Sequence, residues 1–340
     1  MAATPVPPAS APAAPGAPAP LSGRQFELEN AGARAEIGSL AAVLRSLSVD
    51  GIQLTEPVGT DVVAPMGCGM VLAPWPNRVR DGLWQLDGEP QQLDITEPPL
   101  HNASHGLLRN TGYRLLAETA SSVTLGALIA PQHGWPFQLD TSVRYEVEPD
   151  GLTVTHSVVN LGERRAPWAV GAHPYFRVGQ VPVEQLVVTL SGEVRLELDD
   201  RANPVSEHPV EGVFDLRVGR PVAGLNLNTG YGQLANRDGR ADVAWLTAPD
   251  GRSTTLWADA AFGWVQAYTP ASFLRPAAPG PGPGLAIALE PMTAPPNALN
   301  SGIGLIWLQP GESWSGSWGV RYAPGEQKGE QTADRTGAQS

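Results

Sequence analysis

Residues 141–160 read TSVRYEVEPDGLTVTHSVVN, and they point to the fold more directly than any other stretch of the chain. Residues 141–147 and 152–160 are rich in Val and Thr, which are typical of β-strands. Between them, EPDG at 148–151 has the composition of a turn. The stretch therefore predicts two consecutive strands joined by a turn.

The same kind of run recurs through most of the chain. Short segments rich in Val, Leu, Thr and Trp alternate with Gly, Pro, Asp and Asn, and they predict strands at 34–49, 83–86, 122–130, 185–198, 242–246, 254–257, 264–268, 285–289 and 313–322. No segment has the pattern of a convincing amphipathic helix. Many short strands with few helices predict an all-β fold, a large antiparallel sandwich, rather than an α/β sheet. The Pro/Gly tract at 275–284 predicts a long surface loop.

Composition also sets the domain boundaries. Residues 1–23 are dominated by Ala and Pro, and such a segment cannot bury enough apolar surface to offset the entropy lost on ordering. Residues 324–340 are polar, charged and aperiodic. We therefore expect a single folded domain at 24–323 between two disordered tails, and we find no internal repeat.

Charge and cysteine content exclude several classes of function. The formal net charge of −12 and the absence of basic stripes argue against a nucleic-acid partner. A single cysteine, Cys68, excludes an internal disulfide and a zinc site built on paired thiolates, and it fits a reducing compartment. There is no signal-peptide pattern and no apolar run of about 18 to 20 residues, so we expect no membrane segment and a soluble cytoplasmic protein.

Three residues stand out as candidates for acid/base chemistry. His173 lies in GAHPYF at 171–176, His105 in NASHGLLR at 102–109, and Glu290 directly follows the apolar run at 285–289. For each there is a structural alternative. A lone histidine is more often a core residue, and a carboxylate after an apolar run either pairs with a buried positive charge or acts as an acid or base.

Neighbouring residues bear on these alternatives. Trp168, Tyr175 and Phe176 surround His173 in the sequence, and aromatic side chains either pack against the C–H faces of sugars or belong to the core. Asn77 and Arg78 offer an amide beside a guanidinium, which is either a binding pair or ordinary surface.

Other kinds of site find little support. The chain has no Gly-x-Ser-x-Gly elbow, and the glycines at 280–284 alternate with proline, unlike a phosphate-binding loop. His101 and His105 are four residues apart, which is a metal-ligand spacing on a helix, but Pro98 and Pro99 directly before them argue against a helix. We therefore expect no metal site.

Four motifs together resemble the aldose 1-epimerase (galactose mutarotase) family. They occur in the family's order and extend over most of the predicted domain: PWPNRVRDG at 74–82, NxxHGLxR at 102–109, GAHPYF at 171–176 and EPMTxPPNA at 290–298. The first is similar to the bacterial subgroup with a Pro-Trp-Pro-Asn-Arg motif. The resemblance implies a β-supersandwich with an open cleft for a monosaccharide, and a cofactor-free interconversion of α and β anomers.

The resemblance also implies residue roles. Glu290 takes the position of the family's general base, His173 that of its general acid, and His105 that of its second histidine. Arg78 matches the substrate-binding arginine, with Asn77 beside it. We expect an ionised Glu290 and a protonated His173 on opposite sides of the sugar ring, facing each other across one cleft with Arg78 on its wall.

One departure from the family concerns substrate choice. Asn228-Thr229, ahead of Tyr231, stands where the family commonly has an Asp-Thr pair. Asparagine at 228 still hydrogen-bonds sugar hydroxyls, but it supplies a donor where an aspartate would only accept.

Two other functions remain open. A glucose-6-phosphate 1-epimerase-like enzyme needs cationic residues that converge on a phosphate, for which Arg80, Arg109 and Arg177 are candidates. A non-catalytic carbohydrate-binding protein needs the cleft but not a paired acid and base. A monosaccharide is the expected partner in each case, and the chain is expected to be a monomer or a homodimer.

Overall fold

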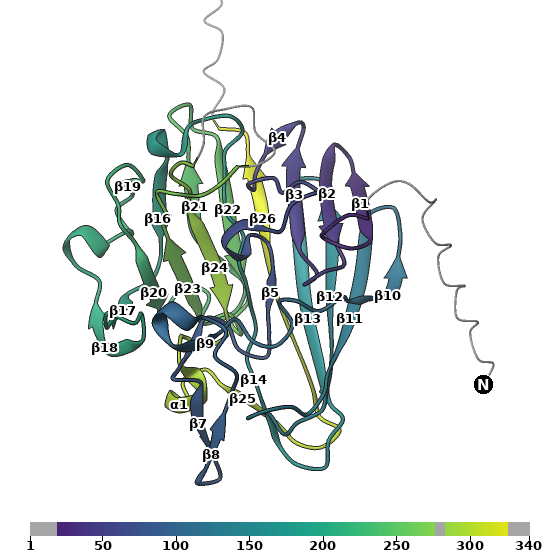
Figure 1. Ribbon diagram of the computed structural model, residues 1–340. Helices are drawn as coiled ribbons and strands as arrows, with labels where there is room; N and C mark the ends of the chain where they lie inside the picture. The colour runs from purple at the N-terminus through teal and green to yellow at the C-terminus, as the bar shows by residue number, and fades with distance from the viewer. Residues whose placement is uncertain (1–18, 276–282, 326–340) are drawn as a thin grey trace, which may run out of the picture.

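The computed structural model describes residues 19–275 and 283–325. Nearly all regular structure in this part of the chain is antiparallel β-sheet, which confirms the predicted all-β fold (Figure 1). The described residues contain one α-helix, the four-residue α1 (Ala298–Ser301), and four short 3-10 turns: η1 (Pro65–Gly67), η2 (Pro98–Leu100), η3 (Val183–Gln185) and η4 (Gly212–Phe214). No helix in the described part of the chain is long and apolar enough to cross a membrane.

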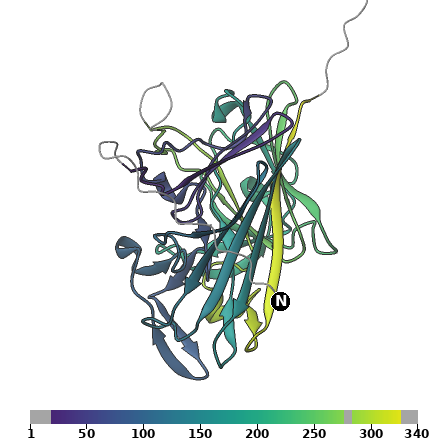
Figure 2. The ribbon, with the colours of Figure 1, turned by 90° about the vertical axis from the view of Figure 1, so that its right-hand side faces the viewer.

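The larger sheet has nine strands. In spatial order they are β10 (Arg114–Glu118), β11 (Ser122–Ile129), β12 (Leu139–Glu148), β13 (Gly151–Asn160), β26 (Ser313–Ala323), β22 (Ser253–Ala258), β21 (Ala241–Thr247), β16 (Val187–Leu190) and β19 (Arg220–Pro221). Its long strands run side by side in Figure 2.

The predicted pair of strands at 141–160 forms the β12–β13 hairpin of this sheet. The pairing runs from Leu139 opposite Asn160 to Glu148 opposite Gly151, so the turn is tighter than the predicted EPDG loop. Buried and half-buried residues alternate along β12 because successive side chains of a strand point to opposite faces. One face of this sheet therefore packs on the core.

The second large sheet has seven strands. In spatial order they are β18 (Pro204–Pro209), β17 (Val194–Leu198), β20 (Asn228–Gly232), β23 (Trp264–Tyr268), β24 (Ala288–Met292), β15 (Gly171–Ala172) and β5 (Val71–Leu72). Val265, Ala267 and Leu289 on one face of this sheet belong to the same buried cluster as Leu256 and Val320 of the nine-stranded sheet. The two sheets thus pack together as a sandwich.

Smaller sheets complete the fold. A four-stranded sheet consists of β1 (Gln25–Asn30), β2 (Ala33–Gly38), β3 (Leu44–Val49) and β4 (Ile52–Gln53), and three strand pairs are β14 (Ala166–Trp168) with β25 (Ile306–Leu308), β6 (Arg78–Arg80) with β9 (Asn102–Ser104), and β7 (Leu83–Leu86) with β8 (Glu89–Gln92). The last pair turns at Asp87-Gly88, as the sequence predicts. The pairing of β6 with β9 matters most here, because it joins two of the four motifs.

Two expectations concern chain segments outside the described residues. Residues 1–18 and 326–340 contain most of the two predicted tails, and residues 276–282 contain most of the predicted Pro/Gly loop. At the base of that loop, Phe273 and Gly284 form an isolated antiparallel bridge.

Candidate active site

Glu290 lies in the middle of β24 rather than after the end of a strand. The strand predicted at 285–289 is observed at Ala288–Met292, and it continues through Pro291, which lies opposite Val265. Pro291 is tolerated because β15, on the other side, pairs with β24 only at Met292. The Glu290 side chain is 2% exposed and emerges from the face opposite the core.

His173 follows β15 and lies beside Glu290. Its backbone exchanges hydrogen bonds with Met70 and Gly69, which fixes the segment against β5. The imidazole Nε2 is 3.5 Å from Glu290 Oε1. One face of the imidazole stacks on the Tyr175 ring, with centroids 5.2 Å apart and planes at 16°.

The aromatic residues near His173 in sequence do not line the pocket. Trp168, Tyr175 and Phe176 are at most 1% exposed, so they belong to the core. Tyr175 supports the imidazole from behind. The aromatic side chain that does line the pocket is Tyr268 on β23, which sequence reasoning did not single out.

The β6–β9 pairing brings the first two motifs together. Arg78 is paired with Ser104, and the backbone N–H of His105 donates to the Asn77 carbonyl oxygen at 2.8 Å. Both Asn77 (φ 55°) and His105 (φ 62°) have left-handed backbone conformations at the ends of these short strands. The His105 ring meets the His173 ring edge-on, with centroids 5.6 Å apart.

Arg78 is held by the carboxylate of Glu97, a residue that the sequence analysis did not single out. Its guanidinium donates to both oxygens of Glu97, at 2.7 and 2.8 Å, in a forked ion pair. Its backbone N–H donates to Asn77 Oδ1 at 3.0 Å. Arg78 thus offers the pocket an oriented but charge-compensated group.

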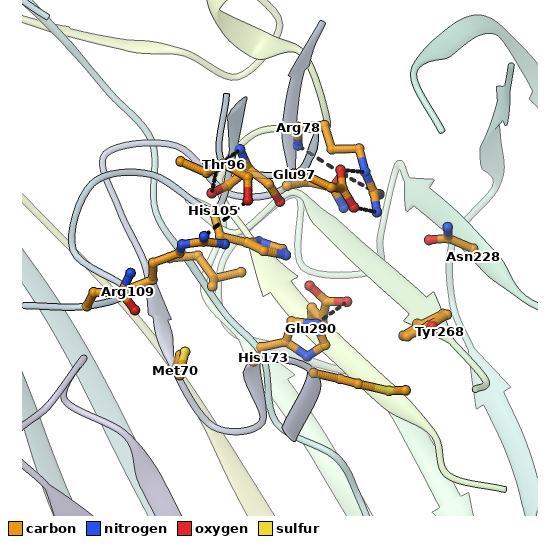
Figure 3. Close-up of a pocket in the computed structure, with 16 residues that line it drawn as sticks. Met70, Arg78, Thr96, Glu97, His105, Arg109, His173, Asn228, Tyr268 and Glu290 are labelled. Carbon is orange, nitrogen blue, oxygen red and sulfur yellow. Dashed lines mark hydrogen bonds and ion pairs between the residues drawn. The ribbon is translucent and has the colours of Figure 1, made fainter. Parts of the chain in front are cut away.

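A single cavity of about 350 Å³ contains all six residues nominated from the sequence. This volume lies in the range of about 300 to 1,000 Å³ that is typical of small-molecule pockets. Figure 3 shows Glu290 and His173 together at its centre, with Arg109 on one side and Asn228 and Tyr268 on the other. The lining residues that were not nominated include Met66, Met70, Leu72, Thr96, Glu97 and Tyr268.

The expected placement of Glu290 and His173 on opposite sides of a bound ring is wrong. A separation of 3.5 Å leaves no room for a sugar between them. Both groups instead approach the pocket from the same side. The anomeric hydroxyl and the ring oxygen of a cyclic aldose are bonded to the same carbon, so an adjacent acid and base can still reach both.

The burial of Glu290 and His173 bears on their expected charge states. Burial raises the pKa of Glu290 to about 8, and burial lowers the pKa of His173 to about 4. Burial, with further contributions from His173, Arg78 and Arg109, holds the pKa of His105 well below its usual value. Removal from water thus disfavours the charged form of both groups, which opposes the expected ion pair.

Asn228 lies at the start of β20 and reaches the pocket beside Tyr268, its cross-strand partner. Its Oδ1 accepts a hydrogen bond of 2.8 Å from Nε2 of Gln266. Gln266 is buried on β23, directly opposite Glu290. The sequence offered one signal for it, a single polar residue within the apolar run at 264–268.

The three arginines nominated for a phosphate do not converge. Arg80 pairs with Asp199, and Arg177 pairs with the buried Glu56. Arg109 alone lines the cavity; it donates to the Thr96 carbonyl oxygen at 3.2 Å and forms no ion pair with any residue that the structure describes.

His101 and His105 do not form a metal site. His101 is exposed and contacts Asp81 at 3.0 Å, whereas His105 faces the cavity. Within residues 19–275 and 283–325, no group of three or more His, Cys, Asp or Glu side chains could hold a metal ion.

Comparison with known proteins adds a family assignment. A family model described as aldose 1-epimerase matches residues 24–321. The uncharacterized protein YihR of Escherichia coli K12 is 31% identical over 297 residues, covering 86% of this chain and 91% of the relative.

Solved structures share the fold at low identity. A GalM/aldose epimerase homologue from Caenorhabditis elegans has a TM-score of 0.77 at 17% identity, covering 88% of this chain and 98% of that one. A putative aldose 1-epimerase from Escherichia coli K12 has a TM-score of 0.74 at 20% identity, covering 88% and 99%. Galactose 1-epimerase from Lactobacillus acidophilus has a TM-score of 0.72 at 18% identity, covering 89% and 95%.

Proposed function

The chain belongs to the aldose 1-epimerase family, and on that premise we propose that it interconverts the α and β anomers of a free hexose or a closely related aldose. The observation that carries this proposal is the contact between His173 Nε2 and Glu290 Oε1, 3.5 Å apart in a polar cavity of about 350 Å³. Ring opening needs one proton removed and one proton supplied, and this pair holds the groups for both.

The proposed cycle begins with a proton transfer within the pair. Movement of the proton from Glu290 to His173 creates a carboxylate and an imidazolium. Glu290 then takes the proton of the anomeric hydroxyl while His173 protonates the ring oxygen, and the C1–O5 bond breaks to give the open-chain aldehyde. Each of these general acid/base contributions is worth roughly 10²- to 10⁴-fold in rate.

Reclosure restores the enzyme. Rotation about the C1–C2 bond presents the other face of the aldehyde to the C5 hydroxyl. As that oxygen attacks C1, His173 takes its proton and Glu290 returns a proton to the aldehyde oxygen. The product is the opposite anomer, and the pair is again a carboxylate and an imidazolium. Return of the proton from His173 to Glu290 restores the starting state of the enzyme.

The surrounding residues have supporting roles in this proposal. His105 lies edge-on to His173 and is held neutral, so it can accept or donate a hydrogen bond to a sugar hydroxyl without adding charge. Arg78 and Asn77 bind hydroxyls from the β6 side, with the guanidinium fixed by Glu97. Asn228 binds on the far side, next to Tyr268.

Polarimetry and exchange NMR on a panel of free aldoses test the proposal. The protein should accelerate α/β interconversion of at least one sugar, and Glu290→Gln should remove most of that acceleration because the amide cannot accept the anomeric proton. A protein that binds sugars without any acceleration would instead be a carbohydrate-binding protein. An unchanged rate in Glu290→Gln would remove Glu290 from the mechanism.

An aldose with an anionic substituent is a second candidate substrate, and Arg109 is the observation that favours it. This arginine lines the cavity and forms no ion pair with a described residue. Hexose 6-phosphates belong in the same panel. If they are the better substrates, Arg109→Met should raise their KM far more than that of the free sugars, whereas Arg80→Met, outside the cavity, should not.

We also propose a cytoplasmic location and one folded domain at 24–323, in a monomer or a homodimer. The free, buried Cys68 is compatible with a reducing compartment. Cell fractionation, limited proteolysis and sedimentation test the three points in turn.

A further inference from the structure

Gln266 connects the proposed catalytic carboxylate to the side chain that departs from the family pattern. It lies on β23 between two strands, opposite Glu290 of β24 and opposite Gly230 of β20. It is 1% exposed and is not among the residues that line the cavity. Any effect of Gln266 on a substrate therefore passes through a neighbour.

That neighbour is Asn228. Gln266 Nε2 donates to Asn228 Oδ1 at 2.8 Å, and Asn228 makes no other side-chain hydrogen bond within the described part of the chain. Gln266 Oε1 is buried and has no hydrogen-bond partner there. It faces Gly230, where an added Cβ would lie 3.3 Å away.

Reversing both amides would be less favourable. Asn228 Nδ2 would then donate to Gln266 Oε1, and the two N–H groups of Gln266 would lie buried against Gly230 without an acceptor. Orphaned buried N–H groups are rarer than under-satisfied carbonyl oxygens, because an amide nitrogen carries two donors that both lose water. The orientation with Gln266 as donor leaves Oε1 and one of the two Nε2 hydrogens without a partner among the described residues, whereas the reverse orientation leaves both hydrogens without one.

We propose that Gln266 is a positioning residue that makes Asn228 a hydrogen-bond donor to the substrate. With Oδ1 engaged by Gln266, Nδ2 is the group of Asn228 that is free for the sugar. Nδ2 of Asn228 would then donate to a lone pair of a sugar hydroxyl oxygen. An aspartate at this position would instead accept the hydrogen of that hydroxyl. This inference rests on the proposed anomerase function.

Deoxyfluoro sugars separate the two kinds of recognition. Fluorine in place of a hydroxyl can accept a hydrogen bond weakly but cannot donate one, and hydrogen in its place does neither. A protein donor therefore favours the fluoro analogue over the deoxy analogue, whereas a protein acceptor treats them alike. The experiment measures kcat and KM for anomerisation of the best free sugar and its 3-, 4- and 6-substituted deoxy and deoxyfluoro analogues.

We expect the wild-type protein to prefer the fluoro over the deoxy analogue at one position, by about 3- to 10-fold in kcat/KM, the range of one neutral hydrogen bond. Gln266→Met fills similar volume without a donor and frees Asn228 to rotate, so the preference should shrink toward one through KM, with kcat on the parent sugar retained. Asn228→Asp should abolish the preference. Asn226→Asp, which adds the same charge at an exposed position off the cavity, should keep it.

The outcomes are distinguishable. If no free or phosphorylated aldose is anomerised, the proposed function fails and this inference fails with it. If the parent sugar is turned over but the fluoro and deoxy analogues are equivalent at every position, only the role of Gln266 and Asn228 is overturned. If Gln266→Met does not fold, Asn228→Asp decides, because an unchanged preference in that variant also overturns the inference.

Discussion

Two buried histidines, His156 and His173, have similar exposure and opposite surroundings. His156 is 1% exposed in the nine-stranded sheet, where its Nε2 accepts a hydrogen bond of 3.0 Å from Trp318 Nε1. His173 is 5% exposed beside the seven-stranded sheet, where its Nε2 lies 3.5 Å from a carboxyl that is itself buried. Burial lowers the pKa of His156 to about 3 and that of His173 to about 4.

The two imidazoles differ in whether a neighbouring group can exchange a proton with them. Among the described residues, the His156 ring has a neutral donor as partner and no titratable side chain in hydrogen-bonding contact, which indicates a structural role. His173 has a proton-bearing partner and a cavity in front of it. A lowered pKa alone therefore does not distinguish a candidate catalytic histidine from a structural one. The distinguishing features of His173 are an ionisable side chain in contact with its ring and a cavity that the ring lines.

The largest expected effect separates the two histidines by activity. His173→Asn should lower kcat/KM for anomerisation by roughly 10²- to 10⁴-fold, because the ring oxygen loses its acid. His156→Asn should leave kcat/KM of the folded protein within a few fold. Polarimetry on both variants, normalised to folded protein by circular dichroism, makes the comparison; equal losses would contradict it.

The next effect separates them by stability. His156→Ala removes the acceptor of a buried indole N–H and leaves a cavity, so the free energy of unfolding should fall by about 2 to 4 kcal/mol. His173→Ala borders an existing cavity and should cost less. Urea denaturation of the two variants measures the difference, and a larger loss at His173 would reverse our assignment of roles.

A third effect tests the cost of keeping Glu290 buried. The pKa of Glu290 is raised from 4.5 to about 8, so the folded state holds a proton that the unfolded state releases, and stability falls as pH rises from about 4.5 to 8. Glu290→Gln should therefore be more stable than wild type by about 1 to 3 kcal/mol at pH 8, with a smaller gain at pH 5. A gain independent of pH would argue against the raised pKa.

The same linkage runs in the opposite direction for the histidines. Their folded pKa values lie below the usual histidine value of 6.5, so the unfolded state binds more protons and stability is lost as pH falls from about 6.5 toward 4 and 3. His156→Asn should flatten this acid limb of the unfolding curve. Thermal melts between pH 4 and 7 measure it, and an unchanged slope would mean that other groups dominate.

The smallest effect concerns the ring behind His173. The Tyr175 hydroxyl is buried without a hydrogen-bond partner among the described residues, whereas its ring stacks on the imidazole. Tyr175→Phe keeps the stack and removes the unpaired hydroxyl, so stability should change by less than about 1 kcal/mol and kcat should hold. Tyr175→Leu, which loses the stack, should lower kcat more than it changes KM.

The sequence predicted the architecture and the members of the site better than the chemistry of the site. The hairpin at 141–160 follows from local composition. The motifs nominated Glu290, His173, His105, Arg78 and Asn77, and the structure places these residues in one cavity with Asn228. Glu97 and Gln266 were missed because their partners are set by strand register, 19 and 38 residues away in the chain. The pKa shifts of Glu290 and His173 could not be predicted from the sequence because desolvation depends on burial, which local sequence does not specify.

Because Glu290 and His173 lie close together, the pair can conserve its protons through the whole proposed cycle. Every proton that leaves the sugar is received by one member of the pair, and every proton that the sugar gains comes from the other, so a complete turnover exchanges none with bulk water. The rate should accordingly be insensitive to buffer concentration. The burial of both side chains then keeps the pair from exchanging protons with bulk water during the cycle.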